Sequence, residues 1–224
     1  MKKLLLRIGG ILIILILGTI LTLVISFVRI TRVTDGEQIK SYLNPAIALV
    51  IIDVQKNLTT ENGNWILNLE QTDKMIDNIN IIIQKMEEQE FHIIYLQNVF
   101  RKNSIINHMT NRAMEEGTEG SEIDDRIKIV GSNIFKKNKM DGFTSHDFEK
   151  YLINNEISHL IVVGIDAEDC VDKTIKGAIN RNYKITVVSD AIATKTDEKR
   201  NIKITDFENM GLEILSTNEL IKRY

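Results

Sequence analysis

Hydrophobic and polar positions follow one another in blocks that predict strands separated by helices. After Pro45, continuous apolar runs rich in β-branched residues are typical of strands buried on both faces. We predict strands at 46–54, 91–99, 159–165, 184–190 and 212–215, with two further short candidates near IKIV (127–130) and NIF (133–135).

Between these runs, apolar residues recur with the 3.6-residue period of a helix. The clearest case is 72–89, and the other predicted helices are 145–155, 170–181 and about 197–210. Strands that alternate with helices imply right-handed crossovers and a parallel sheet covered on both faces. The pattern therefore predicts an α/β fold: a three-layer, Rossmann-like parallel sheet of about six strands with helices on both faces.

One apolar stretch lies outside this alternation. Residues 8–28 contain no charged side chain, and a helix of that length, at about 1.5 Å per residue, crosses a hydrocarbon core of about 30 Å. The segment after it has no small-residue cleavage pattern, which favours an uncleaved anchor over a secretory signal. We predict a membrane anchor at 1–32, a polar linker at 33–44 and one soluble domain at 45–224.

Basic residues flank this stretch on both sides, so the charge rule for orientation decides little. Lys2, Lys3 and Arg7 form an undiluted cluster before it, which favours a single-pass arrangement with the amino terminus inside and the domain outside; a cytoplasmic domain stays open. Beyond residue 32 the chain carries 23 Lys and Arg against 31 Asp and Glu. That acidic balance disfavours nucleic acid and anionic lipid headgroups as partners.

Two chemically capable side chains fall at the carboxyl ends of predicted strands, where parallel sheets collect their functional groups. Asp53 ends the first strand, and Cys170, the single cysteine, opens a helix shortly after the strand 159–165. An aspartate there often only caps a turn, and a lone cysteine is often a small buried hydrophobe. Their joint placement favours nucleophilic chemistry, because the helix start favours a thiolate and a carboxylate can take the thiol proton.

Five motifs occur in one order along the chain: ALVIIDVQ (48–55), GTEGSEI (117–123), KNKMDGF (137–143), GIDAEDCV (164–171) and VVSDA (187–191). In order and spacing this series resembles the isochorismatase-like cysteine hydrolases of the nicotinamidase/isochorismatase superfamily. The resemblance extends from residue 45 to about 218. It is specific because several separate motifs agree.

The resemblance implies a catalytic set. Asp53 would be the base, Lys137 the cation and Cys170 the nucleophile. A cis peptide bond would join Ile165 to Asp166, and the backbone N–H groups of Asp166 and Cys170 would form the oxyanion hole. For the cation, the neighbouring Lys136 and Lys139 are alternatives on a solvated face, and the spacing to the motif's Phe favours Lys137.

The implied function is a membrane-anchored amidohydrolase that cleaves a C–N bond of a small-molecule substrate through an acyl-enzyme on the cysteine. Cleavage of a C–O bond in a vinyl ether stays open, as do a non-catalytic thiol-based binding or redox-sensing domain and a purely structural membrane partner. The resemblance also allows a homo-oligomer.

Three positions depart from the family pattern, namely Leu58, Asp166 and Ala167, so the substrate-binding residues and the substrate are left unassigned. In the stretch that ends and follows the second strand, LQNVFRKNSIINHM (96–109), His108 alone stands in place of the histidine set of the nicotinamidase branch. One histidine makes a poor zinc site, and we expect neither a catalytic metal nor a cofactor.

Overall fold

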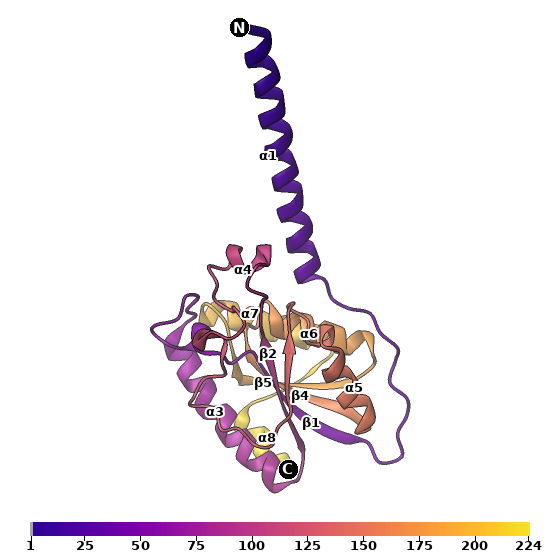
Figure 1. Ribbon diagram of the computed structural model, residues 1–224. Helices are drawn as coiled ribbons and strands as arrows, with labels where there is room; N and C mark the ends of the chain where they lie inside the picture. Colours follow the sequence, from indigo (N-terminus) through magenta and orange to yellow (C-terminus); the bar gives the residue numbers. More distant parts are fainter. Residues whose placement is uncertain (1) are drawn as a thin grey trace.

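Six parallel strands form the centre of the molecule in a computed structural model that describes residues 2–224, with side chains described from Arg7 onwards (Figure 1). The strands are β1 (Ala46–Ile52), β2 (His92–Asn98), β3 (Ile134–Lys137), β4 (Ile157–Ile165), β5 (Lys184–Ala193) and β6 (Glu213–Leu215). Their order is β3-β2-β1-β4-β5-β6. The chain leaves β1 in one direction and β4 in the other, and such a switch point opens a crevice at the carboxyl ends of the strands.

Helices cover both faces, so the predicted three-layer α/β fold is confirmed. One face carries α3 (Leu69–Glu88) and α8 (Thr217–Arg223); the other carries α5 (His146–Asn154), α6 (Cys170–Asn180) and α7 (Asp197–Asn209). Alternate residues of β1 pack into two hydrophobic cores, one on each face of the sheet. Leu49 and Ile51 join the α3 side, whereas Val50 and Ile52 join the α6 side. This division explains why β1 is apolar at every position.

Helix α1 (Lys2–Thr31) projects from the domain (Figure 1). Its segment Arg7–Thr31 is 25 residues long, is apolar enough to cross a membrane and is 0% buried. Two short helices, α2 (Lys56–Thr59) and α4 (Ile105–Met109), and two 3₁₀ turns, η1 (Glu119–Ser121) and η2 (Gly142–Thr144), lie in the connections. Figure 1 shows α4 beside the lower end of α1, and the two helices are in contact.

The segment after α1 is docked on the domain. The backbone N–H and hydroxyl of Thr34 donate to the buried carboxylate of Asp141 at 2.8 and 2.7 Å. Further along, the N–H of Ile39 donates to the carbonyl of Arg181 at 2.9 Å, and the N–H of Met140 reaches back to the carbonyl of Ile30 at 3.1 Å. These bonds hold the end of α1 against the domain surface.

One local prediction is wrong, and one helix was missed. The candidate strand at 127–130 does not form, because side chains satisfy its backbone: Asn80 accepts from the N–H of Lys128, while the Tyr95 hydroxyl donates to the Lys128 carbonyl and accepts from the N–H of Val130. Helix α8 was not predicted, although the Ser216–Glu219 capping box that begins it is readable in the sequence.

Candidate active site

The three residues expected to carry the chemistry come together at the carboxyl edge of the sheet. Asp53 follows β1, Lys137 ends β3, and Cys170 is the first residue of α6 after β4. The Lys137 Nζ lies 2.7 Å from Asp53 Oδ2, and both side chains are buried. The thiol of Cys170 is close enough to this ion pair to shift the pKa of both partners.

The backbone at Asp53 has φ of 52°, in the left-handed region that non-glycine residues seldom occupy. Its N–H nevertheless continues the sheet pattern by donating to the Leu96 carbonyl at 3.0 Å. The chain therefore turns sharply at the point where β1 ends. Unusual backbone conformations of this kind concentrate at functional sites.

Burial dominates the electrostatics of the site. It raises the pKa of Asp53, and the nearby ammonium of Lys137 only partly opposes that shift. Burial would lower the pKa of Lys137, but the Asp53 carboxylate and the neighbouring Cys170 side chain outweigh it and raise that pKa. Burial also raises the pKa of Cys170 well above its ordinary value, whereas the helix start alone suggested a thiolate. Burial thus favours the protonated form of the thiol and increases the affinity of Asp53 for a proton.

The three neighbouring lysines at the end of β3 lie in different environments. Lys136 points outward and pairs with Glu116 at 3.1 Å, with both side chains more than half exposed. Lys139 contributes only its carbonyl, which accepts a hydrogen bond from the Lys137 Nζ at 3.0 Å. Only Lys137, among these three lysines, faces the buried carboxylate.

The start of α6 leaves backbone donors unused. The N–H of Ala167 donates to the Ala193 carbonyl and that of Val171 to the Asp166 carbonyl, at 2.8 and 3.0 Å, whereas the N–H groups of Asp166 and Cys170 donate to no group in the described chain. The peptide bond between Ile165 and Asp166 is cis. Two unused donors beside a thiol suit a developing oxyanion.

A cavity of about 220 Å³ opens above Cys170. Its walls are mostly apolar, and Leu58, one of the departures from the family pattern, is among them. The polar side chains in the wall are those of Asp53, Asn98, Thr110, Asp166 and Asp169. Among the described residues that line the cavity there is no Lys, Arg or His.

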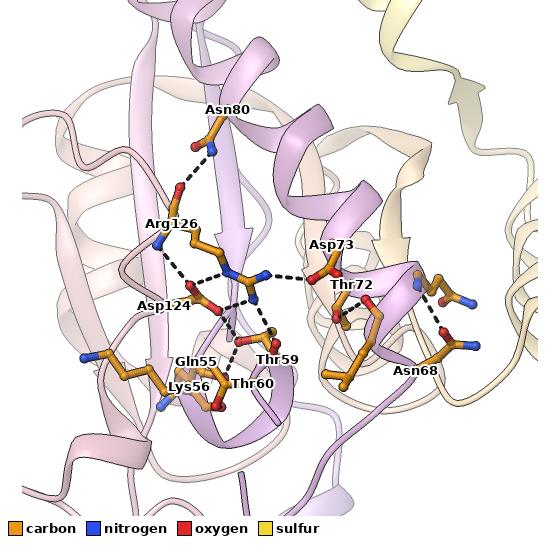
Figure 2. Close-up of polar contacts among 12 residues, drawn as sticks. Gln55, Lys56, Thr59, Thr60, Asn68, Thr72, Asp73, Asn80, Asp124 and Arg126 are labelled. Atoms are coloured by element: carbon orange, nitrogen blue, oxygen red, sulfur yellow. Dashed lines mark hydrogen bonds and ion pairs between the residues drawn. The ribbon is translucent and has the colours of Figure 1, made fainter. Parts of the chain in front are cut away.

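A network of polar contacts fixes the connection that forms one side of the site (Figure 2). The Arg126 guanidinium donates to both oxygens of Asp124, at 2.9 and 2.6 Å, to Asp73 at 2.6 Å and to the Thr59 carbonyl at 2.8 Å. Nearby, the Gln55 amide donates to the Asn98 carbonyl at 2.9 Å. These contacts tie α2 and the 110–127 connection to the end of β2.

Sequence reasoning missed several residues of the site. Asn98 ends β2 next to β1, and its buried Oδ1 accepts no hydrogen bond from the described residues. A polar residue at the end of the apolar run 91–99 was the available signal for it. Phe27 and Ile30 of α1 also line the cavity; nothing in the local sequence connects the apolar amino-terminal helix to this cavity.

The residues present do not fit a metal centre. In the part of the chain with described side chains, no group of three or more His, Cys, Asp or Glu could hold an ion. His108 lies exposed on α4.

Comparison with known proteins gives the family. The family model described as the Isochorismatase domain matches residues 47–219. The chain belongs to the isochorismatase family. It is a member of the isochorismatase-like cysteine hydrolases, and its relatives include amidases.

Three relatives illustrate the range of this family. A probable inactive nicotinamidase of Arabidopsis thaliana is 21% identical, over 77% of this chain and 93% of that protein. The N-carbamoylsarcosine amidase of an Arthrobacter species is 24% identical, over 66% of this chain and 60% of that protein. The crystal structure of a cysteine hydrolase from Pseudomonas syringae superposes with a TM-score of 0.73 at 20% identity, covering 85% of this chain and 98% of that one.

Proposed function

We propose that this isochorismatase-family hydrolase is a membrane-anchored amidase that cleaves the C–N bond of a small amide or urea through an acyl-enzyme on Cys170. The observation that carries the proposal is the buried contact of Lys137 with Asp53, next to the thiol and beneath a cavity. The amidases among the relatives support the choice of a C–N bond.

The chemistry follows from the protonation states. Asp53 Oδ1 accepts no hydrogen bond from the described residues, so it is free to take the thiol proton as the sulfur adds to the substrate carbonyl. Lys137 balances the negative charge. The oxyanion accepts hydrogen bonds from the N–H groups of Asp166 and Cys170.

The intermediate then collapses. The C–N bond breaks as Asp53 returns the proton to the leaving nitrogen, which releases ammonia or an amine and leaves a thioester. Asp53 next takes a proton from water, whose oxygen attacks the thioester carbon. The acid product departs, and the thiol of Cys170 is restored with the proton held by Asp53.

The test uses the full-length protein in detergent micelles with butyramide, nicotinamide, ureidoacrylate and N-carbamoylsarcosine, following released ammonia. Cys170→Ser keeps the volume but offers a far weaker nucleophile, so we expect turnover to fall by about 10⁴-fold or more with folding intact. Most activity surviving in Cys170→Ser contradicts the mechanism. Turnover of none of the compounds, with Cys170 inert to iodoacetamide, favours a non-catalytic binding domain on the same fold.

The anchor is part of the proposal. A core helix of a soluble protein is mostly buried, whereas no part of the apolar window of α1 is buried in the domain, which supports insertion into a bilayer. We favour the amino terminus inside and the domain outside. Protease added to intact cells should digest the domain; protection that is lost only on lysis reverses the orientation.

A further inference from the structure

The cavity above Cys170 is partly built by the membrane helix. Phe27 and Ile30, in the last turns of α1, line it together with Ile106 and Met109 of α4. The bond from the Met140 N–H to the Ile30 carbonyl holds this wall in place. The cavity mouth therefore lies where α1 leaves the apolar span that ends at Thr31.

The rim of the mouth has the composition of a membrane-interface surface. Trp65 and Met109, which line the cavity, are exposed apolar side chains. Ile105 of α4 is exposed as well, and the exposed basic residues Arg101 and Lys102 come shortly before it in the chain. Tryptophan and basic residues next to apolar ones are enriched at the headgroup level of bilayers. This patch differs from the domain as a whole, whose acidic balance disfavours anionic lipid headgroups as partners.

The cavity itself selects against anionic ligands. Its lining carries carboxylates at Asp166 and Asp169 and, among the described residues, no basic side chain. At about 220 Å³ it is smaller than the roughly 300–1,000 Å³ of sites that enclose whole drug-sized ligands. It suits the end of an uncharged apolar molecule whose remainder stays outside.

The depth of the reacting groups orients that molecule. Asp53, which must protonate the leaving nitrogen, is more deeply buried than Cys170, at 1% against 9% exposed. The leaving group must therefore be small, and the bulky acyl part must extend towards α1 and α4.

We propose that the substrate is an uncharged primary amide with a hydrocarbon acyl chain, which enters the cavity from the bilayer between α1 and α4 and is hydrolysed to ammonia and the acid. This inference rests on the proposed amidase function and specifies its substrate class.

The first experiment measures kcat/KM of the full-length protein in proteoliposomes for unbranched primary amides from butyramide upwards. We expect a rise of roughly fourfold for each added CH₂ until the cavity is filled. Butyramide turnover that depends on Cys170 but does not increase with chain length overturns the substrate class and leaves the amidase function standing. No turnover of any amide, short or long, overturns both.

A matched pair of variants tests the acyl path. Met109 in the mouth is 49% exposed, and Ile153, at the end of α5 near the opposite edge of the sheet, is 50% exposed. Met109→Gln should lower the ratio of long-chain to short-chain kcat/KM by about tenfold, because a polar amide replaces an apolar contact. Ile153→Gln should leave that ratio unchanged. Equal ratios in the two variants contradict the path.

A second experiment does not depend on turnover. Trp65, the single tryptophan of the chain, lines the cavity, so phosphatidylcholine brominated on its acyl chains should quench its fluorescence in proteoliposomes. The double variant Trp65→Phe/Ile153→Trp, with the indole at the far edge, should escape quenching. If Trp65 is quenched no more than the relocated tryptophan, the cavity does not open at the bilayer.

Discussion

Two buried aspartates, Asp53 and Asp124, each pair with a basic side chain, and they differ in how completely their oxygens are bonded. Asp124 accepts from the Arg126 guanidinium and backbone and from the Thr59 hydroxyl at 2.5 Å (Figure 2). Asp53 accepts from the Lys137 ammonium through Oδ2, while Oδ1 has no donor among the described groups. The first carboxylate is fully used by the fold, and the second keeps a free oxygen.

The pKa directions follow this difference. Burial raises the pKa of Asp124, but the hydrogen bonds from Arg126 and Thr59 outweigh burial and lower it overall. At Asp53 burial wins, and the pKa is raised. By linkage, Asp124 stabilises the native state at neutral pH, whereas Asp53 lowers its stability as pH rises above the ordinary carboxyl pKa. Incomplete bonding thus trades stability for a group able to accept a proton.

The strongest test of this contrast is Asp53→Asn, which removes the proposed base but keeps the shape of the side chain. We expect kcat/KM to fall by about 10²–10⁴-fold, the usual contribution of general acid–base catalysis. Ammonia release measures it. The double variant Asp53→Asn/Lys137→Met removes both buried charges and should be inactive yet unfold at a temperature no lower than the parent. Near-normal turnover in Asp53→Asn contradicts its role as base.

Asp124→Asn should show the opposite behaviour. Arg126 would lose its buried charged partner, but its own side chain is 44% exposed and that of Asp73 is 58% exposed. Because water screens these charges, we expect a loss of about 1 kcal/mol in the free energy of unfolding, measured with denaturant at pH 7. Turnover per folded molecule should fall far less than in Asp53→Asn. The lowered pKa of native Asp124 stabilises the fold fully only above the pKa of the unfolded state, which is about 3.9. The difference in free energy of unfolding between parent and variant should therefore shrink as pH falls below about 4. A difference that widens in acid argues against the lowered pKa of Asp124.

The parallel sheet could be predicted because its strands and helices are recognisable from the local pattern of apolar residues. A strand buried on both faces reads as an apolar run, and a covering helix reads as a 3.6-residue repeat, so the carboxyl-edge positions of Asp53 and Cys170 followed from the pattern. The choice of Lys137 came from the resemblance, since three lysines in four positions carry no periodic signal.

Other features depend on contacts distant in sequence and were not readable. The Tyr95 hydroxyl forms hydrogen bonds with the backbone of Lys128 and Val130, which replace the bonds of a strand. Thr34 finds the Asp141 carboxylate 107 positions away, so the expected polar linker is docked. The pKa of Cys170 depends on its burial, which no helix start reveals.

The smallest expected effect concerns the neighbouring lysines, and it tests the assignment of the cation. Lys136 is one position from Lys137, but its pair with Glu116 joins two side chains that are 56% and 51% exposed. Exposed pairs contribute between zero and about 1 kcal/mol, so Lys136→Gln should change the free energy of unfolding by less than about 0.5 kcal/mol and leave ammonia release unaltered. Lys137→Gln makes the same substitution at the next residue. There it leaves the buried Asp53 carboxylate without its counter-charge, so it should abolish turnover. Equal losses in the two variants mean that the charge of the run, rather than the buried ammonium of Lys137, supports the reaction.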